Sequence, residues 1–337
     1  MKKSLLSYLV CPLCHSQLTL TTVEQVGDII ETGTLCCSGC DHVFTIKNGI
    51  PNMLPSQLPD IKKKRREVRG WLELAKEQEW YQPEERIDLA LPYVVEELGW
   101  DLAEASDWAA TKVSFEHMLC HYVRPGMRVL EVGAAKTWAG RYFNERGCEY
   151  TACDIMDDPN IGLVRSRFFT ARFGHYEAVT ADGECLPFIH GYFDLVFAIA
   201  TLHHAIDLPR MIKEMARVVK RGGIVAGLNE GVRAFSSSPD SEMQSEEKSY
   251  GINEHVHTLW GYYLAFLRNG LLVTEAMRAI GYECLIEPKR KALVDRLLRI
   301  PLIGKWCAAL VVLGFAHPYD GVTIFARKLA LVFVSAT

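Results

Sequence analysis

Apolar and polar residues follow two different periods in the centre of the chain. Val129, Leu130 and Val132 form a short apolar run that is too compact for an amphipathic helix and predicts a buried strand. A helical pattern covers residues 137–146 and ends at Gly147, and residues 150–153 predict a second strand, which ends on Asp154. The pattern of residues 128–154 therefore predicts a strand, a turn, a helix and a second strand that ends on an acidic residue.

The same alternation continues towards the C-terminus. Residues 177–181, 193–199 and 224–228 predict three further strands. Between the last two, apolar residues from Leu208 to Val219 occupy one helical face, and Asp207 can cap this helix. Regular alternation of strands and helices predicts an α/β fold with a doubly wound, mostly parallel sheet.

Helical patterns flank this core. Residues 61–122 predict several helices, and residues 259–269 predict another that ends at Gly270. Two more strands are expected at 282–286 and 322–327. A basic, apolar insertion at 289–316 separates them. It predicts a helix packed on the core, and the alternatives are an amphipathic lid over the acceptor or a peripheral membrane contact through residues 300–316.

Two pairs of cysteines mark a small N-terminal module. Cys11 and Cys14 form one CxxC pair, and Cys37 and Cys40 form a second pair. This spacing predicts a closed tetrahedral zinc site whose metal supplies the folding energy of residues 1–55, with two redox or incidental pairs as the alternative. We therefore expect structural Zn²⁺.

Composition restricts the class of protein. The chain has 337 residues, 49% hydrophobic content and a formal net charge of −4. The basic run at residues 62–66 predicts either a nucleic-acid patch or a solvated helix start, because acidic residues follow at once. The absence of a broad basic surface makes nucleic acid the less favoured partner. The lack of a typical signal peptide or membrane span predicts a cytoplasmic protein, in which paired cysteines favour metal binding over disulfides.

The turn after the first strand carries the candidate chemistry. Gly133, Ala134 and Ala135 are small enough to let backbone approach a ligand, and Asp154 can accept hydrogen bonds from two ribose hydroxyls. The turn lacks the G-x-G-x-x-G pattern of dinucleotide-binding proteins, so a site for a pyrophosphate is not expected.

The run ADGECLPFIHGYFDLVFAIATLHHAIDLPRMIKEMARVVKRGGIVAGLNE, together with the turn, resembles class I S-adenosylmethionine (SAM) methyltransferases that act on small molecules. The resemblance implies a seven-stranded sheet closed by an antiparallel hairpin, with SAM as cofactor. It implies that Asp154 holds the ribose and that Asp182 and Gly183 hold the adenine. It also implies that Glu131, Gly133 and Ala134 frame the methionine tail, and the same implied cofactor set includes Ile155 and Ala198. Ala135 departs from the family, which usually has a second glycine there, and is tolerated if its φ stays negative.

The cysteine module resembles zinc ribbons that partner or are fused to methyltransferases. The resemblances together imply three parts: a zinc ribbon at 1–55, a linker and helical extension at 56–122 that covers the SAM pocket, and a methyltransferase domain at 123–337. The oligomeric state is left open.

Methyl transfer to a hydroxyl requires a base, and histidine suits neutral pH. His204 follows the fourth strand of the core and His255 lies in a loop expected to cover the same edge, so we expect one of these two to be catalytic. Three functions compete. The first is methylation of a small-molecule, glycan or lipid-linked acceptor, with oxygen as the expected methylated atom. The others are methylation of rRNA or tRNA, and a non-catalytic zinc-ribbon interaction protein with a degenerate SAM fold.

Overall fold

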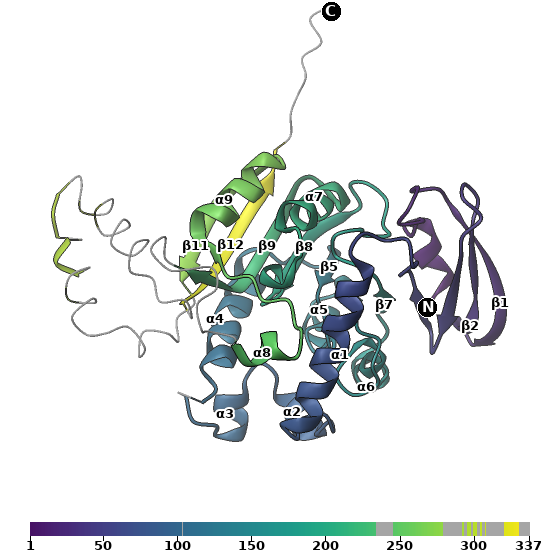
Figure 1. Ribbon diagram of the computed structural model, residues 1–337, viewed down its shortest axis with the longest axis horizontal. Coiled ribbons are helices and arrows are strands. Elements are labelled where there is room, and N and C mark those ends of the chain that lie inside the picture. Colours follow the sequence, from purple (N-terminus) through teal and green to yellow (C-terminus); the bar gives the residue numbers. More distant parts are fainter. Residues whose placement is uncertain are drawn as a thin grey trace, which may run out of the picture.

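The computed structural model describes residues 1–102, 104–233, 245–278 and 320–329, with isolated residues between 292 and 307. Its centre is the expected parallel sheet, in the order β7-β6-β5-β8-β9-β12-β11 (Figure 1). The parallel strands are β5 (Arg128–Val132), β6 (Glu149–Asp154), β7 (Glu177–Thr180), β8 (Phe193–Ile199) and β9 (Val219–Arg233). The doubly wound fold class and the five core strands are therefore confirmed.

Two apolar clusters cover the two faces of this sheet. Helices α7 (Leu208–Val218) and α9 (Leu259–Arg268) pack on one face. The other face is covered by α4 (Ser106–His121), α5 (Gly140–Glu145) and α6 (Ser166–Phe173). Neighbouring residues of β5 separate accordingly, since Leu130 and Val132 belong to the first cluster and Val129 to the second. Further α-helices of the described residues are α1 (Ile61–Glu77), α2 (Glu85–Ala90), α3 (Val94–Leu98) and α8 (Ser245–Ser249).

The closing hairpin is present, but its first strand differs from the expected one. β12 (Asp320–Lys328) pairs antiparallel with β9 and with β11 (Leu271–Arg278). The pairing partner thus precedes residues 282–286, which lie outside the described residues, as does most of the insertion at 289–316. α9 ends at Arg268 and β11 begins three residues later, so Gly270 provides a turn directly into the sheet.

The N-terminal module adds to the same sheet. Its strands β1 (Leu18–Val26), β2 (Ile29–Cys37), β3 (Val43–Lys47) and β4 (Ile50–Asn52) form an antiparallel meander. β4 pairs with the edge strand β7, and the Met53 amide donates to the Thr180 carbonyl at 2.7 Å. Tyr8 stacks on Tyr192 with 4.3 Å between ring centroids, and both Tyr8 and Leu9 belong to the apolar cluster that contains α7. The module therefore covers what would otherwise be an exposed sheet edge.

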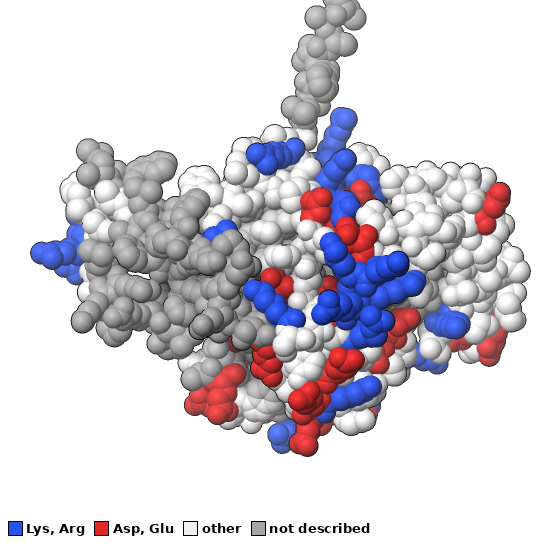
Figure 2. All heavy atoms as spheres, viewed as in Figure 1, with Lys and Arg blue, Asp and Glu red and all other residues white. Residues whose placement is uncertain are grey.

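Helix α1 runs across the carboxyl edge of the parallel strands (Figure 1). Figure 2 shows basic side chains gathered over its first half and acidic side chains towards its second half. Lys62, Lys63, Arg65 and Arg66 are exposed, as a solvated helix start requires, but Lys64 is buried. No helix within the described residues is long and apolar enough to cross a membrane.

Candidate active site

A cavity of about 720 Å³ lies at the carboxyl ends of β5, β6, β7 and β8, beneath α1. Ligands of doubly wound α/β proteins bind at this edge, and the volume is typical of a site for small molecules. Of the residues expected to bind the cofactor, Gly133, Asp154, Ile155, Asp182 and Gly183 line the cavity. Glu131, Ala134 and Ala198 are buried and are absent from its described lining.

Backbone amides hold the Asp154 carboxylate in place. Its Oδ2 accepts a hydrogen bond from the Ala135 amide at 2.7 Å, and its Oδ1 accepts one from the Met156 amide at 2.8 Å. Each oxygen keeps a second lone pair that can accept from a ligand hydroxyl. Burial raises the pKa of Asp154 above its usual value, while these amides act in the opposite direction.

The turn after β5 adopts left-handed backbone conformations. Gly133 has φ 77°, and a Cβ atom there would lie 2.3 Å from the side chain of Thr201. Ala135 has a positive φ of 42°. The sequence expectation that an alanine is tolerated here required a negative φ, so that condition is not met. A non-glycine residue in this region carries about 1–2 kcal/mol of strain. The strained conformation is the one that points the Ala135 amide at Asp154.

Asp182 places a buried carboxylate oxygen without a partner beside the cavity. It is buried, and its Oδ1 accepts from the Glu184 amide at 2.9 Å and from Lys64. Its Oδ2 is buried without a hydrogen-bond partner among the described residues. Because an unsatisfied buried acceptor is costly, this atom marks a place for a ligand donor such as the adenine amino group. Gly183 is required by packing, since a Cβ there would lie 2.7 Å from Val132 Cγ1.

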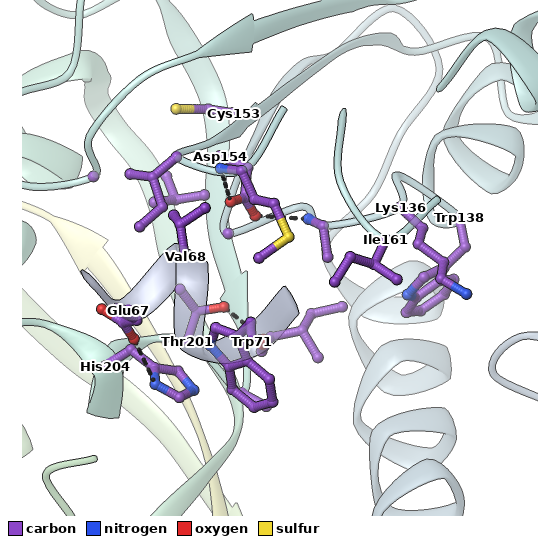
Figure 3. A pocket seen from close by; sticks show the side chains of 18 of the residues that line it. Glu67, Val68, Trp71, Lys136, Trp138, Cys153, Asp154, Ile161, Thr201 and His204 are labelled. Atoms are coloured by element: carbon purple, nitrogen blue, oxygen red, sulfur yellow. Dashed lines mark hydrogen bonds and ion pairs between the residues drawn. The ribbon is translucent and has the colours of Figure 1, made fainter. Parts of the chain in front are cut away.

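Helix α1 supplies cavity residues that sequence reasoning missed. The Lys64 ammonium lies 2.5 Å from Asp182 Oδ1 and 2.9 Å from Glu184 Oε1, with all three side chains buried. One turn later Glu67 contacts His204 at 3.2 Å, and Trp71 packs edge-on against the same imidazole at 5.7 Å between centroids (Figure 3). The spacing of three to four residues places these side chains on one helical face. The burial of Lys64 could not be predicted, because the neighbouring basic residues indicate a solvent-exposed helix start.

Aromatic side chains form much of the remaining wall. Five of the seven tryptophans line the cavity, and Trp108 packs edge-on against Trp138 at 6.2 Å between centroids. The five are Trp71, Trp80, Trp100, Trp108 and Trp138. The described lining contains two lysines, and each is paired: Lys64 with Asp182, and Lys136 with buried Asp88 at 3.1 Å. The wall is therefore mainly apolar and leaves no unpaired cation among the described lining residues.

The two histidines expected to be catalytic lie in different environments. His204 lines the cavity, whereas His255 is exposed and is not part of the described lining. Burial lowers the pKa of His204, but Glu254, Glu67 and the Asn253 carbonyl outweigh it and raise the pKa to about 9. Glu131, behind the cavity wall, accepts a hydrogen bond from Tyr150, and burial raises its pKa to about 8.

The four cysteines of the N-terminal module converge on one point. Their sulfur atoms lie within 4.8 Å of one another, with 3.6 Å between Cys11 and Cys40 and 3.4 Å between Cys14 and Cys37. A tetrahedral zinc ion with Zn–S bonds of about 2.3 Å separates its sulfurs by roughly this amount. Hydrogen bonding by Ser16 lowers the pKa of Cys14 to about 6, and the Gly39 amide donates to Cys37 Sγ. The residues fit structural zinc, with Cys37 rather than Cys36 as the ligand.

Comparison with known proteins explains this combination of cavity and ribbon. Residues 130–227 match the family model of the methyltransferase domain, and residues 2–49 match that of Trm112p-like proteins. Residues 130–227 thus belong to a methyltransferase domain. The expected fold of SAM-dependent methyltransferases and the expected zinc ribbon in front of it are confirmed.

Relatives with curated names are methyltransferases of small or carrier-bound molecules. The malonyl-(acyl-carrier protein) O-methyltransferase of Enterobacter lignolyticus is 32% identical over 99 residues, which cover 29% of this chain and 37% of the relative. The sterol 24-C-methyltransferase of Debaryomyces hansenii is 26% identical over 205 residues, which cover 57% of this chain and 50% of the relative. The chain thus spans half or less of the length of these relatives.

A solved structure shows the same fold over most of the chain. The geranyl diphosphate C-methyltransferase of Streptomyces coelicolor A3(2), solved with Mg²⁺, geranyl diphosphate and S-adenosyl-L-homocysteine, has a TM-score of 0.51. It is 15% identical, and the match covers 82% of this chain and 100% of that one. This likeness describes the architecture of the methyltransferase domain.

Proposed function

We propose that the protein transfers a methyl group from SAM to a small, largely apolar acceptor, at oxygen. The observation that carries the proposal is the cavity at the carboxyl edge of β5–β8, in which amides fix Asp154 and Asp182 Oδ2 has no partner among the described residues. A ligand with ribose hydroxyls and an amino group on its ring complements these two acids.

SAM would be held by the residues that end the four strands. In this proposal Asp154 accepts from the ribose hydroxyls, and Asp182 Oδ2 accepts from the adenine amino group while Oδ1 keeps Lys64. Gly133 and Ile155 shape the wall beside the methionine tail and ribose, and Ala134 lies behind this wall in the turn. Glu131 and Ala198 support the strand ends from within the core, and Gly183 permits the packing beneath the adenine.

The acceptor would occupy the tryptophan-lined part of the cavity. Flat apolar walls favour a neutral hydrophobic molecule, and the pairing of both lysines leaves no described lining cation for a phosphate. An RNA substrate needs a basic surface, which the net charge of −4 does not provide. Methylation of rRNA or tRNA and a role without catalysis are therefore the less favoured functions.

Of the two expected catalytic histidines, we propose that His204 acts on the acceptor. It lines the cavity next to Trp71 and Thr201, and its ring is held by Glu67 and Asn253 (Figure 3). His255 is exposed outside the described lining and is not assigned this role. A cytoplasmic location is part of the proposal, because no disulfide bond joins the described cysteines.

Titration calorimetry with SAM tests the cofactor site. Asp154→Ala should weaken SAM binding at least about tenfold, as expected for loss of hydrogen bonds to a charged acceptor of about 1.5–3 kcal/mol. Asp157→Ala, three residues later and exposed, is the matched control and should bind SAM as the native protein does. Native protein that does not bind SAM would refute the proposal.

Labelled SAM identifies the acceptor class. The purified protein should transfer the labelled methyl group into an extract of small molecules and lipids and leave total RNA unlabelled. Label in RNA alone would refute the small-molecule assignment while leaving SAM binding intact.

A further inference from the structure

A group of buried side chains beside the cavity is not explained by SAM binding. His203 and His204 follow β8, and Glu254 lies on the loop that precedes β10 (His257–Thr258). One nitrogen of each histidine and one carboxylate oxygen of Glu254 lie within 4.8 Å of one another. The group adjoins the tryptophan-lined part of the cavity through His204.

The hydrogen bonds of the two imidazoles fix which nitrogen faces the centre of this group. His203 Nδ1 lies 2.8 Å from Glu230 Oε2, and His204 Nδ1 lies 2.9 Å from the Asn253 carbonyl oxygen. Both partners are acceptors, so both Nδ1 atoms carry the proton. Each Nε2 atom then faces inward, at 3.8 Å and 3.7 Å from the two oxygens of Glu254, and can bind a metal ion once it carries no proton.

These inward distances are too long for hydrogen bonds and suit a shared ion. A tetrahedral metal with bonds of about 2.0–2.2 Å separates its ligand atoms by roughly 3.4 Å. Metal-binding histidines characteristically donate their other N–H to a carboxylate or a carbonyl, as Glu230 and Asn253 accept here. The arrangement is therefore that of a metal ligand set with its supporting hydrogen bonds.

Glu254 gives an independent indication. Its side chain is 4% exposed, and Oε2 has no hydrogen-bond partner among the described residues. Glu230 and Glu67 are also buried and contact the same two histidines, so three carboxylates face two imidazoles. Buried charge of one sign requires compensation, which a divalent cation at the centre would provide.

We propose that His203, His204 and Glu254 bind a divalent first-row transition metal at the edge of the acceptor cavity. Two nitrogen ligands and one oxygen ligand suit Zn²⁺, Fe²⁺, Mn²⁺ or Co²⁺ and disfavour Mg²⁺ and Ca²⁺, which prefer oxygen. Three protein ligands leave a coordination position open for the acceptor oxygen, which the metal would polarise. Polarisation of the acceptor oxygen by the metal rests on the proposed function, and in this role His204 acts on the acceptor through the cation. The metal site itself does not depend on the proposed function.

Cobalt binding tests the site without SAM or acceptor. Protein whose ribbon is loaded with zinc is titrated with Co²⁺ by calorimetry and by visible absorption. We expect one added site with nitrogen and oxygen ligation and without the sulfur-to-cobalt charge-transfer band that binding at the ribbon would produce. Glu254→Gln should weaken this binding at least about tenfold, and Glu230→Gln, which removes the support of His203, about 10–100-fold.

Glu247→Gln on α8 is the matched control and should bind Co²⁺ with native affinity. The melting temperature and the SAM affinity of each variant show that it is folded, and they separate failure of the metal site from failure of the cofactor site. No added Co²⁺ site in the native protein, or equal affinity in native protein and Glu254→Gln, would overturn the inference.

Discussion

Replacing Lys64 by methionine tests how α1 is attached to the cofactor cavity. Methionine keeps most of the length and apolar character of the side chain and removes the charge that lies 2.5 Å from Asp182 and 2.9 Å from Glu184. Removing one member of a buried ion pair leaves an uncompensated charge and costs about 3–5 kcal/mol. Arg210 still pairs with Glu184, so only Asp182 is left without a cation, and we expect a loss near 3 kcal/mol.

The assay is urea unfolding followed by tryptophan fluorescence. Lys63→Met is the matched control, because Lys63 is 70% exposed and its pair with Asp60 should contribute at most about 1 kcal/mol. Adding Asp182→Asn to Lys64→Met should recover part of the loss, since the amide removes the uncompensated charge. If Lys64→Met costs no more than Lys63→Met, the buried ion pair does not hold α1 in place and the reasoning is wrong.

Three further predictions concern a core acid, the ribbon and the strained turn. The Glu131 pKa of about 8 exceeds its unfolded value of 4.5, so the stability that Glu131 contributes is complete below pH 4.5 and is lost as pH rises to 8, at about 1.4 kcal/mol per pH unit. Glu131→Gln should therefore remove this pH dependence of the unfolding free energy, measured by urea unfolding between about pH 5.5 and 7.5. An unchanged slope in the variant would contradict the prediction. Chelation of zinc, or Cys14→Ser, should lower the melting temperature of the whole chain in calorimetry, because the ribbon and the domain share one apolar cluster. A main transition that does not shift would contradict this coupling. Ala135→Gly should relieve about 1 kcal/mol of strain from the left-handed backbone conformation, and the greater conformational entropy of glycine in the unfolded chain should offset part of this gain. We therefore expect equal or higher stability in thermal unfolding. A clear loss of stability would show that the alanine methyl group is needed.

Much of the methyltransferase core was accessible from local pattern. The five parallel strands follow apolar runs, and the cap of α7 by Asp207 was expected from the residue type, as the bond from the Arg210 amide confirms. Local pattern placed the helix after β5 too early, since α5 begins only at Gly140, after a turn in which Ala135 and Thr137 have positive φ. Small residues predicted a close approach of backbone, and hydrogen bonding to Asp154 decided its geometry.

Residues that meet across long stretches of sequence could not be predicted in this way. Lys64 and Asp182 are 118 positions apart, and a lysine within a basic run carries no local sign of burial. β11 and β12 lie on opposite sides of the insertion in the sequence, so apolar runs alone could not identify β11 as the partner of β12. The addition of β4 to β7 likewise depends on a sheet edge that exists only once the domain has folded.

The sequence by itself determined the strands and helices, the four-cysteine ligand set and the acids at the strand ends, because periodicity and spacing act within a few residues. Tertiary structure alone decided which charges are buried, and it brought His203, His204 and Glu254 to one point at the edge of a cavity that five tryptophans line. The physical reason is that burial and charge pairing are properties of the packed chain. A charged residue keeps its ordinary chemistry in an isolated helix and acquires a partner only when another element is folded against it.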